Sequence, residues 1–330
     1  MKKIAINGMG RIGRAALKII LETPNLEIVA VNDIVSVENI AYLLKYDSVY
    51  GIYEKDVSHD DNNLIVDDKR VKFYSVRNPE ELPWKEENVD VVIESTGLFT
   101  SSEDAAKHIT AGAKTVVISA PTKSKDIPTV VHGVNTQDGK TKVFSCASCT
   151  TNNISPVVEV LGRRIGIKKA IMTTIHAYTA SQAMVDAPSK KNFRMGRAGA
   201  ANIVPTSTGA AIATTKALPE YEGKFDGVAL RVPIPVGSIS DLTFVTDRPV
   251  TVEEVNSIFK EEAATDRYKN ILGVTEQPLV SSDIIKSSFA STVDLGMTRV
   301  VDGDLLKVMT WYDNEWGFTN QMIRQILDEE

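Results

Sequence analysis

Residues 3–22 read KIAINGMGRIGRAALKIILE, and they predict how the first half of the chain folds. The apolar run Lys3 to Asn7 is typical of a buried strand, and Arg11 to Glu22 has the spacing of a helix. Between them lie Gly8, Gly10 and Gly13 in the pattern GxGxxG. Glycine permits a tight turn, a close backbone approach to a ligand and close packing of helix on strand. This unit therefore indicates a dinucleotide-binding fold, with the diphosphate held at the helix N-terminus.

The first 145 residues continue to alternate strand-like and helix-like segments, which predicts a parallel sheet covered by helices. Further strands are expected at Glu27–Asn32, Val89–Glu94, Thr115–Ser119 and Thr129–Val134, and further helices at Val37–Lys45 and Ser102–Ala111. Asp33 follows the second strand, 20 residues beyond Gly13. A carboxylate there can accept hydrogen bonds from ribose hydroxyls and repels a 2′-phosphate, so NAD is favoured over NADP. A turn or helix-capping role for Asp33 is the alternative.

The sequence changes character from about residue 170, where longer alternating strands with short connections predict a mostly antiparallel sheet. The clearest of these strands are Ile171–Tyr178, Val228–Val232, Leu242–Thr246 and Leu305–Trp311. Residues 180–217 form a long loop rich in small and basic residues, followed by a small-residue helix. A loop of this length is expected to be functional. The chain closes with a helix predicted over Thr319–Glu330.

Length and composition narrow the class of protein. A chain of 330 residues fits two domains, and 43% hydrophobic with 24% charged residues is ordinary for a globular protein. A net charge of −6 argues against a surface built to bind nucleic acid or anionic lipid. No run approaches the length of a membrane helix, and the N-terminus lacks the pattern of a signal peptide. With only two cysteines, no disulfide framework is expected, so the cytoplasm is the predicted location.

The segment SCASCTTNNISP, residues 145–156, places Cys149 at the start of a predicted helix. Unpaired N–H groups and the helix dipole at that end favour a thiolate, the form that attacks carbonyl carbon. Of the four histidines, only His176, in TTIHAYTAS at the end of a threonine-rich strand, has catalytic-looking flanks. A thiolate–imidazolium pair of Cys149 and His176 is therefore predicted. A packing cysteine and a structural histidine are the alternatives.

Other candidate cofactor contacts lie where first-domain strands end, because carboxyl ends of strands line the crevice of a doubly wound sheet. Thr96 and Ser119 are such residues, although either could simply end a strand and begin a loop without binding the cofactor. Arg77 could contact the adenine or face solvent. The loop residues assigned to the cofactor are Gly8, Gly10, Arg11, Ile12 and Gly13.

Eight segments, in one order along the whole chain, resemble the phosphorylating, NAD-dependent glyceraldehyde-3-phosphate dehydrogenases. They are INGMGRIGR, LLKYDSVYG, ESTGLF, ASCTTN, HAYT, NIVPTSTGAA, RVPIPVGSISDL and WYDNEWGF. The resemblance implies an α/β protein with a Rossmann domain over residues 1–148, joined by a C-terminal helix of about 315–330. It also implies an α+β catalytic domain over residues 149–314 with a mostly antiparallel sheet. The expected assembly is a homotetramer, with the loop near 180–200 approaching a neighbouring subunit's cofactor.

The resemblance further implies a glycolytic reaction in which D-glyceraldehyde 3-phosphate is oxidised through a hemithioacetal and a thioester on Cys149. Inorganic phosphate then releases 1,3-bisphosphoglycerate. It assigns Thr179 and Arg231 to the substrate phosphate and Asn314 to the nicotinamide. It assigns a second anion site, for inorganic phosphate, to Ser148, Thr150, Arg194, Thr208 and Gly209. Hydroxyls and backbone N–H groups are directional donors, and a guanidinium can clamp two phosphate oxygens.

Some residues depart from the family pattern. Asn153 stands where a second cysteine is common, while Cys146 precedes the nucleophile in CASC. Without a second cysteine pair no zinc site is expected. Cys146 is interpreted as a packing residue that could form a disulfide under oxidation. Phe318 replaces a tyrosine, and Ala187-Pro188 leaves strict NAD selectivity open.

Two other functions remain open on sequence grounds. Erythrose-4-phosphate dehydrogenase shares the nucleotide and cysteine motifs but does not need inorganic phosphate. The other is a non-catalytic thiol redox sensor that uses the CASC segment.

Overall fold

The computed structural model describes residues 1–136, 141–189 and 192–328. The chain divides into two compact units, each described here by itself. Unit 1 comprises Met1–Val130, Gln137–Ala147 and Met322–Glu330, and unit 2 comprises Val131–Thr136 and Ser148–Gln321. Helix α7 (Trp316–Asp328) runs through the division at residue 322. In the part of the chain described, no helix is long and apolar enough to cross a membrane.

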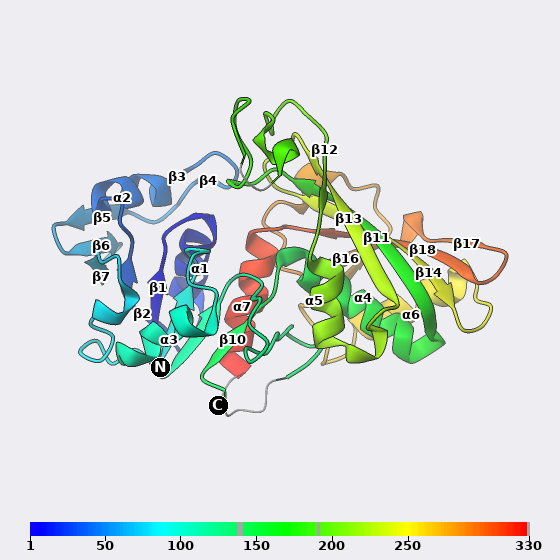
Figure 1. The fold of residues 1–330 in the computed structure, drawn as a ribbon, viewed down its shortest axis with the longest axis horizontal. Helices are drawn as coiled ribbons and strands as arrows, with labels where there is room; N and C mark the ends of the chain where they lie inside the picture. The colour runs from blue at the N-terminus through cyan, green and yellow to red at the C-terminus, as the bar shows by residue number, and fades with distance from the viewer. Residues whose placement is uncertain (137–140, 190–191, 329–330) are drawn as a thin grey trace. The chain divides into compact units, whose positions relative to one another are not determined.

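Unit 1 is built on a sheet that is parallel through most of its width (Figure 1). Strand β1 (Lys2–Asn7) lies at its centre, parallel to β2 (Leu26–Asn32) and β8 (Val91–Glu94). Beyond β8 come β9 (Thr115–Ile118) and β10 (Val143–Ser145), and beyond β2 comes β7 (Lys69–Tyr74), all parallel to their neighbours. The helices of this unit are α1 (Arg11–Glu22), α2 (Val37–Lys45) and α3 (Ser102–Thr110). The predicted helix-covered parallel sheet is confirmed.

One edge of this sheet was not predicted. Beyond β7, strands β6 (Asn63–Val66) and β5 (Val57–Asp60) continue the sheet as antiparallel hairpins. The connections are Asp61-Asn62 and Asp67-Asp68, residue types that favour turns, and Asp67 has a positive φ of 51°. A further short pair, β3 (Tyr46–Asp47) with β4 (Gly51–Ile52), lies outside the main sheet.

The strand predicted over Thr129–Val134 is wrong. Thr129 makes only an isolated bridge to Ser145, and residues 132–134 form a turn. Gly133 has φ of 75°, which a strand does not use, and the carbonyl oxygens of Gly133 and Val134 accept hydrogen bonds from Arg267. The apolar residues of this segment are buried without belonging to a strand, so their hydrophobicity alone was misleading. His132, expected in a first-domain strand, lies in this turn of unit 2.

Unit 2 is built on a second, mostly antiparallel sheet, as predicted. Its long strands are β11 (Ile167–Ala177), β13 (Phe225–Val232), β14 (Ser238–Thr246) and β18 (Leu305–Tyr312). The shorter ones are β12 (Val204–Ser207), β15 (Leu272–Thr275), β16 (Ser291–Asp294) and β17 (Arg299–Val301). The pairs β11–β13 and β15–β16 are parallel, and the others are antiparallel. Short 3₁₀ helices lie at Pro79–Glu81 in unit 1 and at Phe193–Gly196, Pro219–Tyr221, Ser281–Ile284 and Leu295–Met297 in unit 2.

The core of unit 2 lies between one face of this sheet and helices α4 (Cys149–Ile165), α5 (Ala210–Ala217) and α6 (Val252–Ala263) (Figure 1). Every second residue of β14 and β18 is buried, because successive side chains of a strand point to opposite faces. Leu242 and Phe244 of β14 and Val157 of α4 are fully buried there. The opposite face of the sheet stays partly exposed, with Ile171 60% and Val228 49% accessible.

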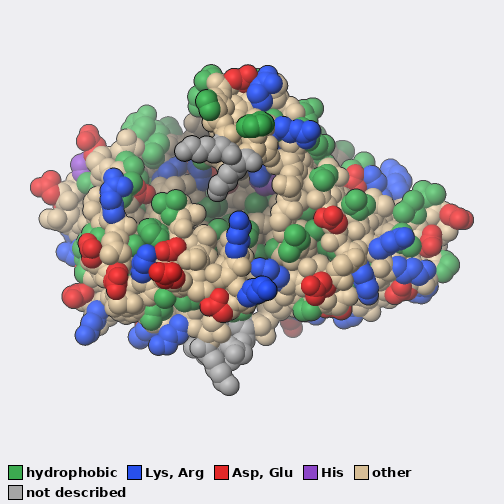
Figure 2. All heavy atoms as spheres, viewed as in Figure 1, with side chains coloured by type: hydrophobic (Ala, Val, Ile, Leu, Met, Phe, Trp, Pro, Cys, Tyr) green, Lys and Arg blue, Asp and Glu red, His purple; other side chains and the backbone are tan. Residues whose placement is uncertain are grey.

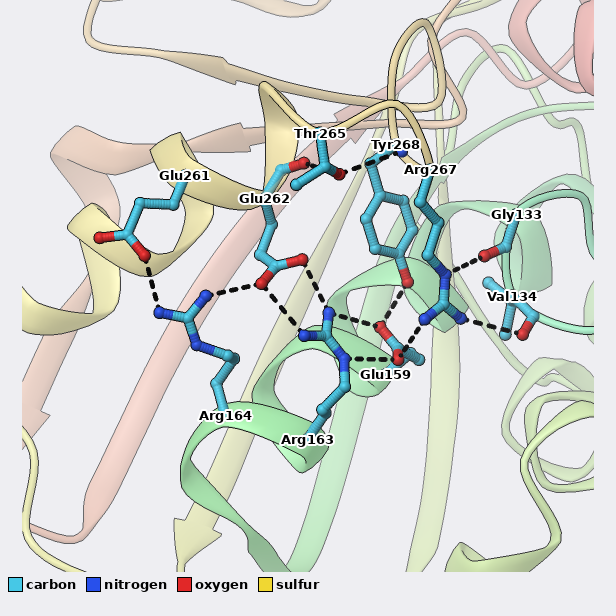
Figure 3. A network of polar contacts seen from close by, with 10 residues as sticks. All are labelled: Gly133, Val134, Glu159, Arg163, Arg164, Glu261, Glu262, Thr265, Arg267 and Tyr268. Carbon is cyan, nitrogen blue, oxygen red and sulfur yellow. Dashed lines mark hydrogen bonds and ion pairs between the residues drawn. The ribbon is translucent and has the colours of Figure 1, made fainter.

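A network of ion pairs fastens α4 to its surroundings (Figure 3). Arg163 donates to Glu159 on its own helix and to Glu262 of α6 at 2.7 Å. Arg164 reaches Glu262 at 2.6 Å. Arg267 donates to Glu159 at 2.9 Å and to the Gly133 carbonyl at 2.8 Å, so it ties the turn at 131–136 to this helix. Glu159 and Glu262 each pair with two arginines, and a network of this kind stabilises the fold more than isolated surface ion pairs do.

Candidate cofactor pocket and catalytic centre

Unit 1 contains an open pocket of about 400 Å³ where the strands β1, β2 and β8 end. Five of the predicted cofactor residues line it: Gly8, Gly10, Asp33, Arg77 and Thr96. The pocket is also lined by residues that were not predicted: Asn7, Asn32, Ile34, Val76, Ser95, Leu98 and Phe99. Most of them lie at the carboxyl end of a parallel strand or within two residues of it, where ligands of such sheets bind, whereas Leu98 and Phe99 lie four and five residues after β8.

Each of the three positions of the motif requires glycine for a different structural reason, or leaves room for a ligand. A Cβ on Gly8 would lie 2.7 Å from the Thr96 nitrogen, and Gly8 has φ of 98°. A Cβ on Gly13 would lie 2.0 Å from the Gly8 carbonyl oxygen, so this glycine allows α1 to pack on the loop. A Cβ on Gly10 would meet nothing within 4 Å. Gly10 therefore faces open space at the start of α1, whose N-terminus has no side-chain cap.

Asp33 and Arg11 each have partners within the protein. Asp33 accepts hydrogen bonds from the Met9 nitrogen at 2.7 Å and the Val35 nitrogen at 3.0 Å, so it stabilises the loop as well as lining the pocket. The Arg11 side chain instead donates to Asp47 at 2.6 Å. Burial opposes ionisation of Asp47, but hydrogen bonds from Tyr50, Arg11 and Val49 outweigh it and lower its pKa. The contribution expected of Arg11 and Ile12 is thus that of the helix N-terminus, through backbone N–H groups.

Five predicted cofactor residues do not line this pocket: Arg11, Ile12, Gly13, Ser119 and Asn314. Gly13 and Ile12 lie in the first turn of α1, and Ser119 directly follows β9. Asn314 belongs to unit 2, where its Oδ1 accepts hydrogen bonds from Ser238 Oγ at 3.0 Å and the Gly237 nitrogen at 3.2 Å. These contacts fix the amide orientation of Asn314, so its Nδ2 group points away from Gly237 and Ser238.

In unit 2, Cys149 is the first residue of α4, as the sequence predicts. Ser148 caps this helix, because its Oγ accepts a hydrogen bond from the Thr151 nitrogen at 3.0 Å. His176 is the second-last residue of β11 and is only 3% exposed. Its Nε2 lies 3.4 Å from Cys149 Sγ, so the two residues that the sequence paired are in contact.

The other side of the His176 ring faces Arg231 of β13. Nη1 of Arg231 lies 2.6 Å from His176 Nδ1, and both groups lie near the Ala177 carbonyl oxygen. Nδ1 therefore faces an acceptor, the Ala177 carbonyl oxygen at 2.7 Å, as well as the guanidinium of Arg231. When the ring proton is on Nδ1 and donated to Ala177, Nε2 of the neutral imidazole is an acceptor directed at the sulfur of Cys149.

The expected thiolate–imidazolium pair is not what this arrangement favours. Burial, aided by the charge of Arg231, lowers the pKa of His176 from 6.5 to about 3. Burial raises the pKa of the Cys149 thiol, and this exceeds the opposite effects of Arg231 and of the hydrogen-bonding groups at the start of α4. Both pKa shifts favour the neutral thiol and the neutral imidazole in the ligand-free protein. The helix N-terminus acts in the predicted direction, but desolvation outweighs it.

The residues expected at the two anion sites all lie in unit 2. Thr150 is buried in the first turn of α4 beside Ser148, and its Oγ1 lies 2.8 Å from Tyr312 Oη. Thr179 follows β11 and contacts Ser181 at 2.8 Å. Thr208 and Gly209 precede α5, and Thr208 Oγ1 accepts from the Ala210 nitrogen at 3.1 Å. Arg194 is exposed in the loop after β11, and residues 190 and 191 of that loop lie outside the described residues.

Tyr312 is a buried residue of this centre that the sequence analysis did not single out. Its Oη lies 2.8 Å from Thr150 Oγ1 and 2.8 Å from Thr174 Oγ1, and its ring meets His176 edge-on at 5.9 Å. It therefore connects α4 to β11. The alternation along β18, which buries residues 306, 308, 310 and 312, would have placed it on the face toward α4.

Two family models match this chain, one within each of the two units. Residues 2–102 match the NAD binding domain of glyceraldehyde 3-phosphate dehydrogenase, and residues 148–314 match its C-terminal domain. The chain belongs to the glyceraldehyde-3-phosphate dehydrogenase family. It is 48% identical over 325 residues to glyceraldehyde-3-phosphate dehydrogenase 2 of Streptomyces avermitilis, covering 97% of this chain and 96% of that protein. It is also 48% identical over 324 residues to the Geobacillus stearothermophilus enzyme, with the same coverage.

Membership of this family identifies NAD as the cofactor and the chain as an oxidoreductase. Among the described residues, no group of three or more His, Cys, Asp or Glu side chains could hold a metal ion. Figure 2 shows Lys and Arg interspersed with Asp and Glu on the face it presents, without a large field of one sign.

Proposed function

We propose that the protein oxidises D-glyceraldehyde 3-phosphate and phosphorylates the product to 1,3-bisphosphoglycerate, with NAD as the electron acceptor, in glycolysis or its reverse. The observation that carries this proposal is the contact between Cys149 and His176 at the N-terminus of α4, in a chain whose relatives bear this enzyme's name. A nucleophile at a helix N-terminus next to an imidazole is suited to covalent catalysis on a carbonyl group.

The pocket of unit 1 fits NAD. Gly8 and Gly13 keep the loop close to β8 and α1, and Gly10 leaves space at the uncapped helix N-terminus for a diphosphate. Asp33 and Arg77 lie where the adenosine would bind, and Asn314 would hold the nicotinamide carboxamide through Nδ2. When bound, NAD accepts the hydride from the substrate carbon.

Cys149 is the proposed nucleophile. Its sulfur adds to the aldehyde carbon while the thiol proton passes through His176 to the carbonyl oxygen, which gives a hemithioacetal. His176 then takes the hydroxyl proton as the hydride leaves that carbon. The product of this step is a thioester on Cys149. An oxygen of inorganic phosphate then attacks the thioester carbon, the carbon–sulfur bond breaks, and the departing Cys149 sulfur takes back the proton held by His176. The N–H groups at the start of α4 can stabilise the oxyanion that forms in each step.

The two phosphates need separate donors, and the proposed sets come from different segments. Thr179 and Arg231 would bind the phosphate of the substrate. Inorganic phosphate would be bound by Ser148, Thr150, Arg194, Thr208 and Gly209. The hydroxyl of Thr150, in the turn that begins with Cys149, is supported by the buried Tyr312. This contact supports a fixed position for the Thr150 hydroxyl near the sulfur that inorganic phosphate must displace.

The test is an NADH assay with D-glyceraldehyde 3-phosphate, with and without inorganic phosphate. NADH formation should require phosphate or arsenate and should be lost in Cys149→Ser, while NAD binding to this variant persists. Preference for erythrose 4-phosphate with phosphate-independent turnover would instead indicate the related dehydrogenase. No turnover with either aldehyde would overturn the proposal and favour a redox sensor.

We further propose a cytoplasmic homotetramer. Exposed apolar residues lie on the outer face of the unit 2 sheet and in the loop that follows β11, and an assembly could bury them. They are Ile171, Met184, Val185, Phe193, Ile203 and Val228. Native mass spectrometry tests the assembly, and a monomer would contradict it. A reducing compartment suits Cys149, which has to remain a thiol.

Cys146 is proposed to be a packing residue, since it is 3% exposed and its nitrogen donates to the Ile118 carbonyl at 3.0 Å. Peptide mass spectrometry after peroxide treatment tests this interpretation. A thiol-reversible crosslink between Cys146 and Cys149 would contradict it.

For the domains we propose the division 1–148 and 149–314, with the helix of about 315–330 joining the first part.

A further inference from the structure

A buried carboxylate lies directly behind the cofactor pocket and has no part in the reaction. Glu94, the last residue of β8, is 1% exposed and does not line the pocket. Its Oε2 accepts hydrogen bonds from Asn7 Nδ2 at 2.6 Å and lies 3.0 Å from His108 Nε2. Its Oε1 accepts from the backbone nitrogen of Thr96 at 2.8 Å and from the Thr96 hydroxyl. A buried carboxylate with this many donors is fully satisfied and fixed in one orientation.

The direction of these hydrogen bonds follows from the residue behind His108. Trp84 is fully buried, and its Nε1 donates to His108 Nδ1 at 3.0 Å. An indole nitrogen can only donate, so Nδ1 of His108 must be the acceptor, and the ring proton lies on Nε2. His108 therefore donates to Glu94. Hydrogen bonds run in one direction from Trp84 through His108 to the carboxylate, which is needed as an acceptor only.

On its other side the carboxylate is connected to the wall of the pocket. Asn7 Oδ1 accepts from Asn32 Nδ2 at 2.7 Å, and Asn32 in turn makes two hydrogen bonds of 2.9 Å with the backbone of Val76. Asn7, Asn32, Val76 and Thr96 all line the pocket. They come from four different segments of unit 1. Glu94 binds Asn7 and Thr96 directly, and Asn7 connects it to Asn32 and Val76.

We propose that Glu94 is a positioning residue for NAD, which fixes Asn7 and Thr96 in the pocket wall and is itself oriented by His108 and Trp84. This inference rests on NAD as the cofactor. Replacing the carboxylate by an amide puts an N–H₂ group against one of the present donors, because Glu94→Gln has the same shape but only one acceptor oxygen. Asn7 or Thr96 must then turn away, and the wall no longer matches the ligand.

The test is calorimetric measurement of the Kd for NAD in Glu94→Gln, together with steady-state kinetics and thermal unfolding. The Kd and the KM for NAD are expected to rise about tenfold, while kcat at saturating NAD stays unchanged. Glu262→Gln is the matched control, since it removes the charge of a buried carboxylate that pairs with the partly exposed Arg163 and Arg164 in unit 2. It should lower the melting temperature and leave the Kd for NAD as in the wild type.

A second pair of variants keeps the inference testable if Glu94→Gln does not fold. The amide in His108→Gln can still donate to Glu94 and accept from Trp84, whereas His108→Leu can do neither. We expect His108→Gln to keep the wild-type Kd for NAD and His108→Leu to raise it. If Glu94→Gln or His108→Leu loses stability with no change in Kd, the role is structural and the inference fails. Failure of the wild type to bind NAD would instead remove the proposed function as well.

Discussion

Nη1 of Arg231 lies 2.6 Å from Nδ1 of His176, on the opposite side of the ring from Cys149. The guanidinium thus lies against the imidazole that is proposed to take a proton during the reaction. Arg231 is also a proposed ligand of the substrate phosphate. A phosphate bound there would draw the guanidinium and neutralise its charge, which would let His176 accept a proton more readily. This arrangement would couple substrate binding to the basicity of His176 through one residue.

Arg231→Leu should therefore raise the pKa of His176 in the ligand-free protein from about 3 toward 6.5. Burial is the larger cause of the depression and remains in the variant, so the recovery is expected to be partial. Titration of the histidine ring signals by NMR measures it. Arg248→Leu, which removes an exposed arginine paired with Glu254, is the control and should leave the titration of His176 unchanged. A His176 pKa that is equal in Arg231→Leu and the wild type would contradict the coupling.

The low pKa of His176 also predicts how stability depends on pH. Between pH 6.5 and about 3 the unfolded chain binds a proton at His176 that the folded protein does not bind. The contribution of His176 to the free energy of unfolding is therefore fully present above pH 6.5, and it is lost as the pH is lowered from 6.5 to about 3. One proton contributes a slope of up to about 1.4 kcal/mol per pH unit.

Urea unfolding at a series of pH values should show this slope reduced in His176→Gln, although acidic groups still contribute in both proteins. Tyr42→Phe, a substitution of an exposed tyrosine, is the control and should keep the wild-type slope. Equal slopes in His176→Gln and the wild type would mean that His176 is not buried in its neutral form.

Tyr312→Phe is expected to weaken the binding of inorganic phosphate more than the binding of the aldehyde. The substitution leaves the buried hydroxyls of Thr150 and Thr174 without their common partner, at a cost of about 1–3 kcal/mol in unfolding free energy. Thr150 is proposed to bind inorganic phosphate, so the KM for phosphate should rise several-fold. Tyr46→Phe, on an exposed tyrosine of unit 1, is the control. A KM change confined to the aldehyde would place Tyr312 elsewhere in the mechanism.

Much of the fold could be predicted from local patterns. The elements around the glycine motif agree with the structure, with α1 at Arg11–Glu22 as predicted, because periodicity and glycine spacing are local properties. The hairpin strands β5 to β7 were missed because they are short and partly exposed, with few apolar residues in a repeating pattern. Residues 129–134 were misassigned because burial of Val130 and Val131 comes from packing outside any strand.

The chemistry of the site was only partly predictable. The position of Cys149 at the helix start and its contact with His176 follow from residue types and flanks. Their charge states do not, because desolvation depends on how completely the folded chain covers them. The contact of Arg231 with Nδ1 joins residues 55 positions apart on the neighbouring strands β11 and β13, and no spacing rule reveals such a pairing.

Two glycines of the cofactor loop allow stability and cofactor binding to be separated. In Gly13→Ala the new methyl group would lie 2.0 Å from the Gly8 carbonyl oxygen, so α1 must move, at a cost of about 1–3 kcal/mol in unfolding free energy. In Gly10→Ala the methyl group meets nothing within 4 Å, and its φ of −69° suits alanine. The ligand-free stability of Gly10→Ala should therefore equal or slightly exceed that of the wild type.

The affinity for NAD should nevertheless fall in Gly10→Ala, because the methyl group occupies space that the diphosphate is expected to use at the start of α1. Thermal unfolding with and without NAD measures both effects in one experiment. Gly10→Ala should lose the stabilisation that NAD confers on the wild type while keeping the ligand-free melting temperature. Retention of the full NAD-induced stabilisation in Gly10→Ala would show that the diphosphate does not approach residue 10.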